Sequence, residues 1–231
     1  MNWKINMRQI AKILLAALWL APVWAGAQTN PPATLEQVTG AMGHARTVLT
    51  RFVQERHLSL FNDPLRSEGW LCFQQPGRIR WETTAPYQSI LVSDGSGVAQ
   101  FEWADDKWKK LDLGLGSALQ NVVSQIAGVM DGRFASDTHG YTASLTNRAD
   151  EIVITLVPQN ETMRKMMAAI EVHLAPDLKA TRRVVLRETD GDYTDIVFTD
   201  QLVNFDPSPN TFDLAAPAAL ATVRAAAGAK P

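Results

Sequence analysis

A catalytic or metal centre needs titratable side chains that converge, so the histidines are the first residues to test. The chain has four of them, and they lie far apart in the sequence. None has a second ligand at the spacing that zinc sites use, and no H-E-x-x-H motif occurs. We therefore expect surface or half-buried histidines that bind no metal, namely His44, His57, His139 and His173.

Nucleophilic chemistry has no clear candidate either. Gly95-Ser96-Gly97 lacks the strand-to-helix context that exposes a catalytic serine, so we interpret it as a hairpin turn. Cys72 is the only cysteine, which excludes an intramolecular disulfide. It lies between Leu71 and Phe73 in a strand-like segment, and we expect a buried, unreactive thiol.

Cofactor and acid–base motifs are also missing. Neither a G-x-x-x-x-G-K-[ST] loop nor a strand-linked G-x-G-x-x-G occurs, so no motif is present to hold a nucleotide. Paired carboxylates such as Asp105-Asp106 lie beside predicted turns, where solvated charge is normal. Spacing alone does not exclude a glycosidase, because its two acids can come from anywhere in the chain. We expect no catalytic residue, no metal and no cofactor.

The first 27 residues have the pattern of a secretory signal peptide. Three basic residues precede an apolar run, residues 13–24, which is too short for a membrane span and is interrupted by Pro22. Ala25-Gly26-Ala27 favours cleavage before Gln28, with cleavage after Ala25 as the alternative. No cysteine stands at the cleavage point, which argues against a lipid anchor. We predict a soluble periplasmic protein.

Length and charge limit the remaining classes. The formal net charge is −2, and it becomes −5 when Lys4, Arg8 and Lys12 leave with the signal peptide. Nucleic acid is a poor partner, since phosphate binding requires clustered basic residues. Residues 28–214 suit a single domain, and the alanine-rich residues 215–231 are predicted to be a flexible tail.

Hydrophobic periodicity predicts a mainly β protein with helices (α+β). Residues 34–49, after the capping residue Thr34, and residues 117–131 show helical spacing. The other segments are short, alternate in polarity and end at turn formers, and no crossover helix separates them, which favours an antiparallel sheet. We expect strands at 50–57, 68–74, 78–83, 88–93, 97–104, 107–111, 141–146, 151–157, 168–175, 181–188, 193–199 and 201–205.

Aromatic and aliphatic side chains on these strands are the strongest remaining signal. Composition alone favours an ordinary sandwich or barrel core. A binding hollow would in addition require a concave sheet and an apolar helix across its mouth.

Two neighbouring segments carry a pattern that points to such a hollow. Residues 69–81 read GWLCFQQPGRIRW and residues 85–95 read APYQSILVSDG. This pattern resembles the LolA family of periplasmic lipoprotein carriers. Further segments are similar to the family's first strand and closing sheet: Phe52-Val53-Gln54, residues 168–200, Phe205 and Phe212-Asp213-Leu214. The resemblance covers most of the mature chain and is weakest over residues 104–165.

The resemblance implies a strongly curved antiparallel sheet, an incomplete β-barrel with a helical lid formed by residues 34–49 and 117–131. It implies a monomer that carries the acyl chains of lipoproteins or related lipids from an inner-membrane exporter to an outer-membrane acceptor. Such cargo needs cover, since each methylene kept from water is worth roughly 0.8 kcal/mol. The expected lining is Phe52, Leu71, Phe73, Ile79, Trp81, Leu91, Phe101, Trp103, Val123, Ile126 and Met130.

One position departs from the family. Characterised members have an arginine before the proline of the x-x-Pro turn, where it holds the lid closed, whereas this chain has Gln75. A neutral amide cannot make an arginine's forked, charged contacts. Arg78 and Arg80 are nearby substitutes for lid control, but strand alternation puts both on one face and Ile79 and Trp81 on the other.

Three alternatives to lipoprotein carriage remain open. A LolA-like accessory protein would export a different lipid, for example a polyene lipid. A LolB-like receptor or sensor would use the same half-barrel at the outer membrane. An enzyme with a lipid-like substrate would require acid, base or metal groups that converge in the hollow.

Overall fold

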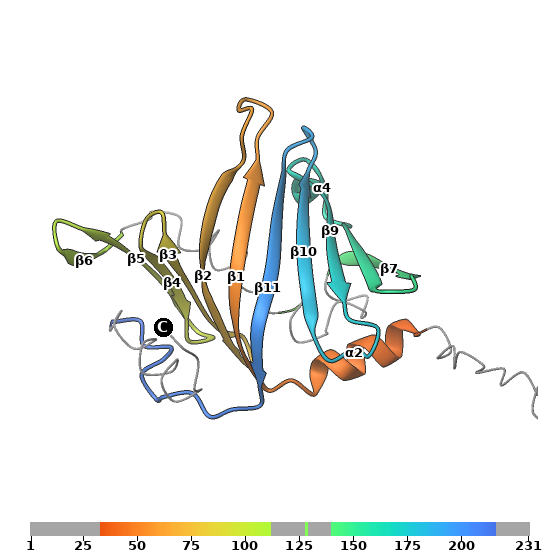
Figure 1. Ribbon diagram of the computed structural model, residues 1–231, viewed down its shortest axis with the longest axis horizontal. Coiled ribbons are helices and arrows are strands. Elements are labelled where there is room, and N and C mark those ends of the chain that lie inside the picture. Colours follow the sequence, from red (N-terminus) through yellow and green to blue (C-terminus); the bar gives the residue numbers. More distant parts are fainter. Residues whose placement is uncertain (1–32, 112–127, 129–139, 216–231) are drawn as a thin grey trace, which may run out of the picture. The chain divides into compact units, whose positions relative to one another are not determined.

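The computed structural model describes residues 33–111, 128 and 140–215. These described residues form one antiparallel sheet of eleven strands, together with helices α2 (Leu35–Gly43) and α4 (Glu161–Arg164) (Figure 1). The strands are β1 (Thr47–His57), β2 (Leu65–Gln74), β3 (Arg78–Ala85), β4 (Ser89–Ser93), β5 (Val98–Ala104), β6 (Lys107–Lys110), β7 (Tyr141–Asn147), β8 (Ile152–Pro158), β9 (Met167–Leu174), β10 (Thr181–Glu188) and β11 (Tyr193–Val203). The predicted mainly β, antiparallel class is confirmed.

The sheet consists of two meanders joined at one strand pair. Its order is β6-β5-β4-β3-β2-β1-β11-β10-β9-β8-β7, so adjacent strands of the sheet are consecutive in sequence except for the pair β1 and β11. In that pair Phe52 lies opposite Phe198. The predicted turn at Asp190-Gly191-Asp192 joins β10 to β11, and Gly191 has a φ of 98° there, a value that glycine adopts without strain. Within the described residues β6 and β7 are edges, and the sheet does not close into a barrel.

The first helix is shorter than predicted. Thr34 caps α2 through a capping box, but the helix ends at Gly43 and not at residue 49. Strand β1 begins at Thr47, where β-branched residues favour the extended chain. Val48 and Leu49 continue the helical spacing by coincidence, and in the sheet they pack on opposite faces.

Other elements also differ from the prediction, most clearly β2, β11 and α4. β2 begins at Leu65, before the predicted start at residue 68. β11 is one strand and not two, because Asp200, with a φ of 53°, lies where the β1–β11 register shifts, and a bulge absorbs the break. α4 has only four residues, too few to show a helical period. It is capped by Asn160, whose side chain accepts from the backbone N–H of Thr162 and Met163.

Strand pairing divides the side chains of β1–β5 between two buried faces. Leu71 lies opposite Trp81, and Trp81 lies opposite Leu91, so these share a face with Phe52, which we call the Phe52 face. Trp70 belongs to the other face, the Trp70 face. Consecutive residues 69–73 are all buried, which requires that both faces of β2 be covered.

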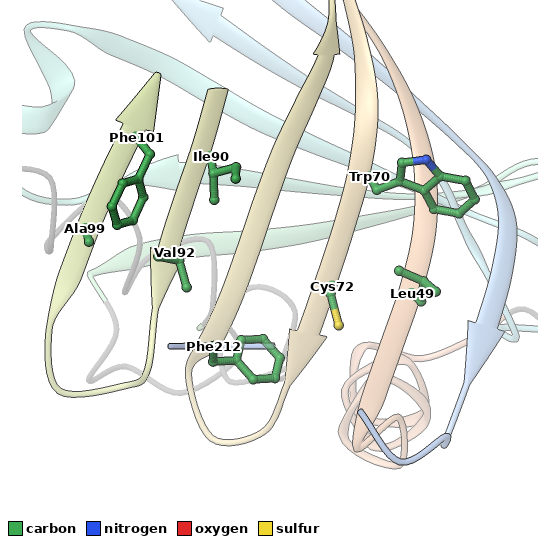
Figure 2. Close-up of a cluster of buried hydrophobic side chains, with 8 residues drawn as sticks. All are labelled: Leu49, Trp70, Cys72, Ile90, Val92, Ala99, Phe101 and Phe212. Atoms are coloured by element: carbon green, nitrogen blue, oxygen red, sulfur yellow. The ribbon is translucent and has the colours of Figure 1, made fainter. Parts of the chain in front are cut away.

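The Trp70 face is covered by the C-terminal residues 204–215. Phe212 is buried among side chains from β1, β2, β4 and β5 (Figure 2). Leu214 and Phe205 pack against the same cluster. The members of the cluster are Leu49, Trp70, Cys72, Ile90, Val92, Ala99, Phe101 and Phe212. This face is therefore ordinary protein core.

A buried ion pair lies beneath that covering segment. The Arg80 side chain is fully buried, and its Nη2 lies 3.2 Å from Glu82 Oε2. Its Nη1 donates to the carbonyl of Thr211 at 3.4 Å, which ties β3 to the C-terminal segment. Cys72 lies opposite Arg80 in the sheet, and burial raises the pKa of its thiol to about 12. The thiol stays protonated at neutral pH, and the predicted burial of Cys72 is confirmed.

Candidate functional site: an apolar face of the sheet

The Phe52 face of the first meander carries a compact apolar cluster. Its buried members are Phe52, Leu71, Phe73, Ile79 and Ile196. The Phe52 and Trp81 rings pack with their centroids 4.4 Å apart and tilted by 38°. Because these side chains alternate with those of the Trp70 face, β1 to β4 present two separate apolar layers.

Some of this cluster stays accessible. Trp81 and Leu91 are half-buried, as are Val98 and Phe198 at its margins. An apolar ligand that covered them would gain roughly 25 cal/mol for each Å² of apolar surface removed from water. The half-buried residues are therefore the candidates for direct ligand contact, while Phe52 beneath them supports the surface.

The same face continues across the second meander. Phe198 pairs with Phe52, and on alternate residues of β11 Ile196 pairs with Val184 of β10. Val184 pairs in turn with Val172 of β9, and Val172 with Ile154 of β8. At the strand spacing of about 4.8 Å, the apolar face from β4 to β8 measures on the order of 30 Å across.

Helix α2 packs on the second-meander half of this face. Val38 is fully buried, and Leu35 and Met42 pack against the same cluster. The sheet residues of that cluster are Tyr141, Ile152, Ile154, Leu156, Ile170, Val172 and Leu174. The helix thus covers part of the apolar face, on the side away from β1–β5.

Along β1 the Phe52 face changes from apolar to polar. Val48, Phe52, Gln54 and Arg56 all project to this side, and the last two lie toward the β1–β2 loop. Arg56 Nη2 lies 3.3 Å from Glu188 Oε1 at the end of β10, and both side chains are partly exposed. The face therefore has an apolar end near α2 and a polar end near the β1–β2 loop.

The structure divides the residues predicted to line a hollow. It brings together Phe52, Leu71, Phe73, Ile79, Trp81 and Leu91 on the Phe52 face. Phe101 lies on the Trp70 face instead, opposite Ile90, and Trp103 follows it on that face, in edge contact with Trp108. This part of the prediction is wrong because alternation within β5 does not reveal its phase relative to β4 across the intervening turn.

Other parts of the prediction were incomplete. Val123, Ile126 and Met130 lie outside the described residues. The prediction included no residue from the second meander, although Ile154, Val172 and Val184 continue the same face. Apolar residues alternate over 152–158, and this pattern could have indicated lining residues in the second meander. The pairing of β1 with β11 was needed, however, to show that both meanders share one face.

The three residues predicted to control the lid have different surroundings. Arg78 and Arg80 share a face of β3, as strand alternation predicted. Arg80 is buried under the C-terminal segment, where it contacts Glu82 and the carbonyl of Thr211, and its role in lid control stays a prediction. Gln75 does reach the helix, because its side-chain Nε2 donates to the carbonyl of Gly43, the last residue of α2, at 3.2 Å.

We expect Gln75→Leu to loosen the last turn of α2. One neutral hydrogen bond contributes about 1 kcal/mol, so amide exchange of residues 40–43 should accelerate roughly fivefold. Hydrogen–deuterium exchange followed by mass spectrometry measures this. Gln74→Leu is the matched control, because the Gln74 side chain accepts from Arg78 and not from α2. Equal acceleration in both variants would contradict a specific contact.

A recess of about 360 Å³ lies at the opposite face, near the ends of β1 and β2. Its lining is mixed in polarity: Arg46, Thr47, Gln74, Gln75, Pro76, Phe205 and Asp206. Thr47 and Gln74 project to the Trp70 face, so this recess is separate from the Phe52 face. A mixed, open lining does not suit a hydrocarbon chain.

Several titratable groups of the described residues form hydrogen-bonded networks. His173, predicted to lie at the surface or half-buried, is buried. His173 Nδ1 lies 2.8 Å from Glu151 Oε2, and hydrogen bonding from His173 lowers the pKa of Glu151. Arg187 makes two hydrogen bonds to Glu171 and lowers the pKa of that carboxyl. In the described part of the chain, no three acidic, histidine or cysteine side chains converge as metal ligands.

These observations define a half-barrel protein: an open antiparallel sheet with one long apolar face, partly covered by a helix, and polar networks outside it. None of the described helices has the length and apolarity that crossing a bilayer requires.

Comparison with known proteins gives the family. The profile described as "Outer membrane lipoprotein carrier protein LolA" matches residues 43–215, and the chain belongs to this family. An outer-membrane lipoprotein carrier protein of Pseudomonas paraeruginosa is 34% identical over 95 residues, which are 40% of this chain and 43% of that protein. The match therefore spans less than half of the relative's length.

Two further similarities extend over more of the chain. A protein of the same description from Chromohalobacter salexigens is 24% identical over 159 residues, 68% of this chain and 71% of that protein. The crystal structure of a LolA superfamily protein from Nitrosomonas europaea aligns with a TM-score of 0.40 at 9% identity, covering 78% of this chain and 97% of that one.

Proposed function

We propose that this protein is a periplasmic carrier that shelters acyl chains of lipoproteins or related lipids against its Phe52 face and moves them between the two membranes. The observation that carries the proposal is the continuous apolar face from β4 to β8, with Trp81 and Leu91 left half-buried. An acyl chain exposed to water costs on the order of 10 kcal/mol, so such a cargo crosses an aqueous space only under cover.

The change in polarity along the Phe52 face determines how the bound lipid is oriented. The acyl tails lie toward α2, against the apolar end of the face. The polar part of the cargo lies toward Gln54 and the Arg56–Glu188 pair, where an ionic or hydrogen-bonding group keeps its partners. Helix α2 covers the tails, and Gln75 helps to hold its end.

Membership of the LolA family supports carriage, and the signal-peptide pattern of residues 1–27 supports the periplasm as its site. An inner-membrane exporter and an outer-membrane acceptor complete the pathway, with the protein acting as a monomer. Carriage of a different lipid is the second candidate. It is favoured by Gln75, which contacts α2 through a single neutral hydrogen bond in place of an arginine's forked contacts.

Native mass spectrometry of protein released from the periplasm without detergent tests the proposal. The expected result is a copurifying lipid, whose mass identifies the cargo class. The delipidated protein should then bind a fluorescent fatty acid with a Kd on the order of 1 μM or below. A lipid-free protein that also takes up neither fatty acid nor lipoprotein would refute carriage.

A further inference from the structure

Large apolar side chains are exposed at the polar end of the Phe52 face. Leu60 is 83% exposed and Phe61 53% exposed in the β1–β2 loop, and Leu65, at the start of β2, is 52% exposed. Met166, between α4 and β9, is 64% exposed. Single exposed apolar residues are ordinary, but four of them on connections that meet at one end of the sheet need an explanation. We call these four residues the apolar tip.

Hydrogen bonds hold the connections of the apolar tip together. The backbone N–H of Ser59 donates to Asp192 Oδ1 at 2.7 Å, which joins the β1–β2 loop to the β10–β11 turn. In that turn, Thr189 donates through its backbone to the carbonyl of Met166 at 3.3 Å and through its hydroxyl to the carbonyl of Lys165 at 2.9 Å. Figure 1 shows the β1–β2 loop and the β10–β11 turn at the same end of the sheet.

The charges around the tip are mixed. Exposed Arg66, which pairs with Glu55, follows Leu65, and exposed Arg164 and Lys165 precede Met166. Asp63 and Asp190 lie on the same connections. Attraction to an anionic surface is therefore weak, and burial of the apolar side chains must supply most of any binding energy.

We infer that the apolar tip inserts into the interfacial region of a phospholipid bilayer. Its side chains are exposed, and none of them lines the recess described above. A bilayer, unlike a protein partner, needs no complementary pocket to receive them. The tip also adjoins the polar end of the Phe52 face, since Glu188, the partner of Arg56, directly precedes Thr189. Membrane contact there would bring the bilayer next to the end where the cargo's polar part lies. Binding of the apolar tip to a membrane is a separate property from the proposed carriage of lipids.

Co-sedimentation with vesicles of phosphatidylethanolamine and a minor fraction of phosphatidylglycerol is the first test. We expect the wild-type protein to sediment with the vesicles and a Leu60→Asp/Phe61→Asp variant to bind at least tenfold less. Val203→Asp is the matched control, because Val203 is 41% exposed at the far end of β11. It should bind like the wild type, and added salt should change binding by less than about twofold.

A label at position 61 reports insertion directly. Cys72 is buried and its pKa is raised to about 12, so a Phe61→Cys protein reacts with a thiol-specific, environment-sensitive dye at the new residue alone. Vesicles should shift the emission of this dye to the blue and leave that of a labelled Val203→Cys protein unchanged. Equal shifts at both positions, or none at position 61, would overturn the inference.

Fatty-acid binding separates this inference from the carrier proposal. The Leu60→Asp/Phe61→Asp variant should keep the fatty-acid Kd of the wild type, because the apolar tip contributes no residue to the apolar cluster of the Phe52 face. Wild-type protein that fails to bind vesicles would overturn membrane insertion even if it binds fatty acid normally. If the wild type did not bind vesicles and the Leu60→Asp/Phe61→Asp variant still slowed lipid transfer, the apolar tip would instead be a contact site for a protein.

Discussion

Leu91→Glu is expected to abolish acyl-chain binding and leave the protein folded. Leu91 is half-buried on the Phe52 face opposite Trp81, so a carboxylate there would lie against the hydrocarbon of any bound chain. Placing an unpaired charge against hydrocarbon costs several kcal/mol, which predicts at least a hundredfold weaker Kd. Fluorescence titration with a labelled fatty acid measures the Kd, and thermal unfolding verifies the fold.

Trp103→Glu is the matched control for this variant. The sequence predicted both residues as lining, but Trp103 lies on the Trp70 face and is 43% exposed. Its replacement should change the fatty-acid Kd by less than about twofold. Normal binding by Leu91→Glu, or equal loss in the two variants, would show that the Phe52 face does not hold the ligand.

Gly69→Ala is expected to destabilise the protein by about 3 kcal/mol or more. A Cβ at this position would lie 1.9 Å from the backbone oxygen of Glu82 and 2.9 Å from Phe52 Cζ. The first contact is with the backbone of the paired strand β3, which cannot move without loss of sheet hydrogen bonds. Urea unfolding followed by circular dichroism gives the free energy of unfolding.

Gly40→Ala provides the contrast. Gly40 is an exposed residue of α2, and a Cβ there would meet no atom within 4 Å. Alanine in a helix interior is more stable than glycine by about 1 kcal/mol, so this variant should gain stability. If Gly69→Ala unfolded at the same urea concentration as the wild type, this would contradict the conclusion that β2 and β3 approach too closely at Gly69 to admit a Cβ.

The fold class followed from the sequence because the strands are short and their turns carry distinct residues. The break at Asp190-Gly191-Asp192 and the capping residue Thr34 were correctly placed. Helix α2 was extended to residue 49 because Val48 and Leu49 happen to match the helical period. Local spacing cannot distinguish that coincidence from a helix, and pairing with β2 and β11 decides the strand.

The candidate site was predictable only within single strands. Alternation correctly separated Ile79 and Trp81 from Arg78 and Arg80 on β3. It could not align β5 with β4, so Phe101 was assigned to the wrong face. The remaining features of the site depend on contacts between residues far apart in the sequence. For example, no local pattern shows that the C-terminal segment covers Arg80 and accepts its hydrogen bond through the carbonyl of Thr211.

Pairing of β1 with β11 has a consequence for how the protein folds. The two meanders are built from local hairpins, but the joint between them brings together Phe52 and Phe198 from opposite ends of the sequence. Such non-local pairing forms slowly, because a long loop must close before the contact is gained. Each meander can therefore form independently of the other. The apolar face becomes continuous only when β11 has been synthesised and has paired with β1. Until then both halves expose apolar edges, which makes this interval the time of greatest risk of aggregation.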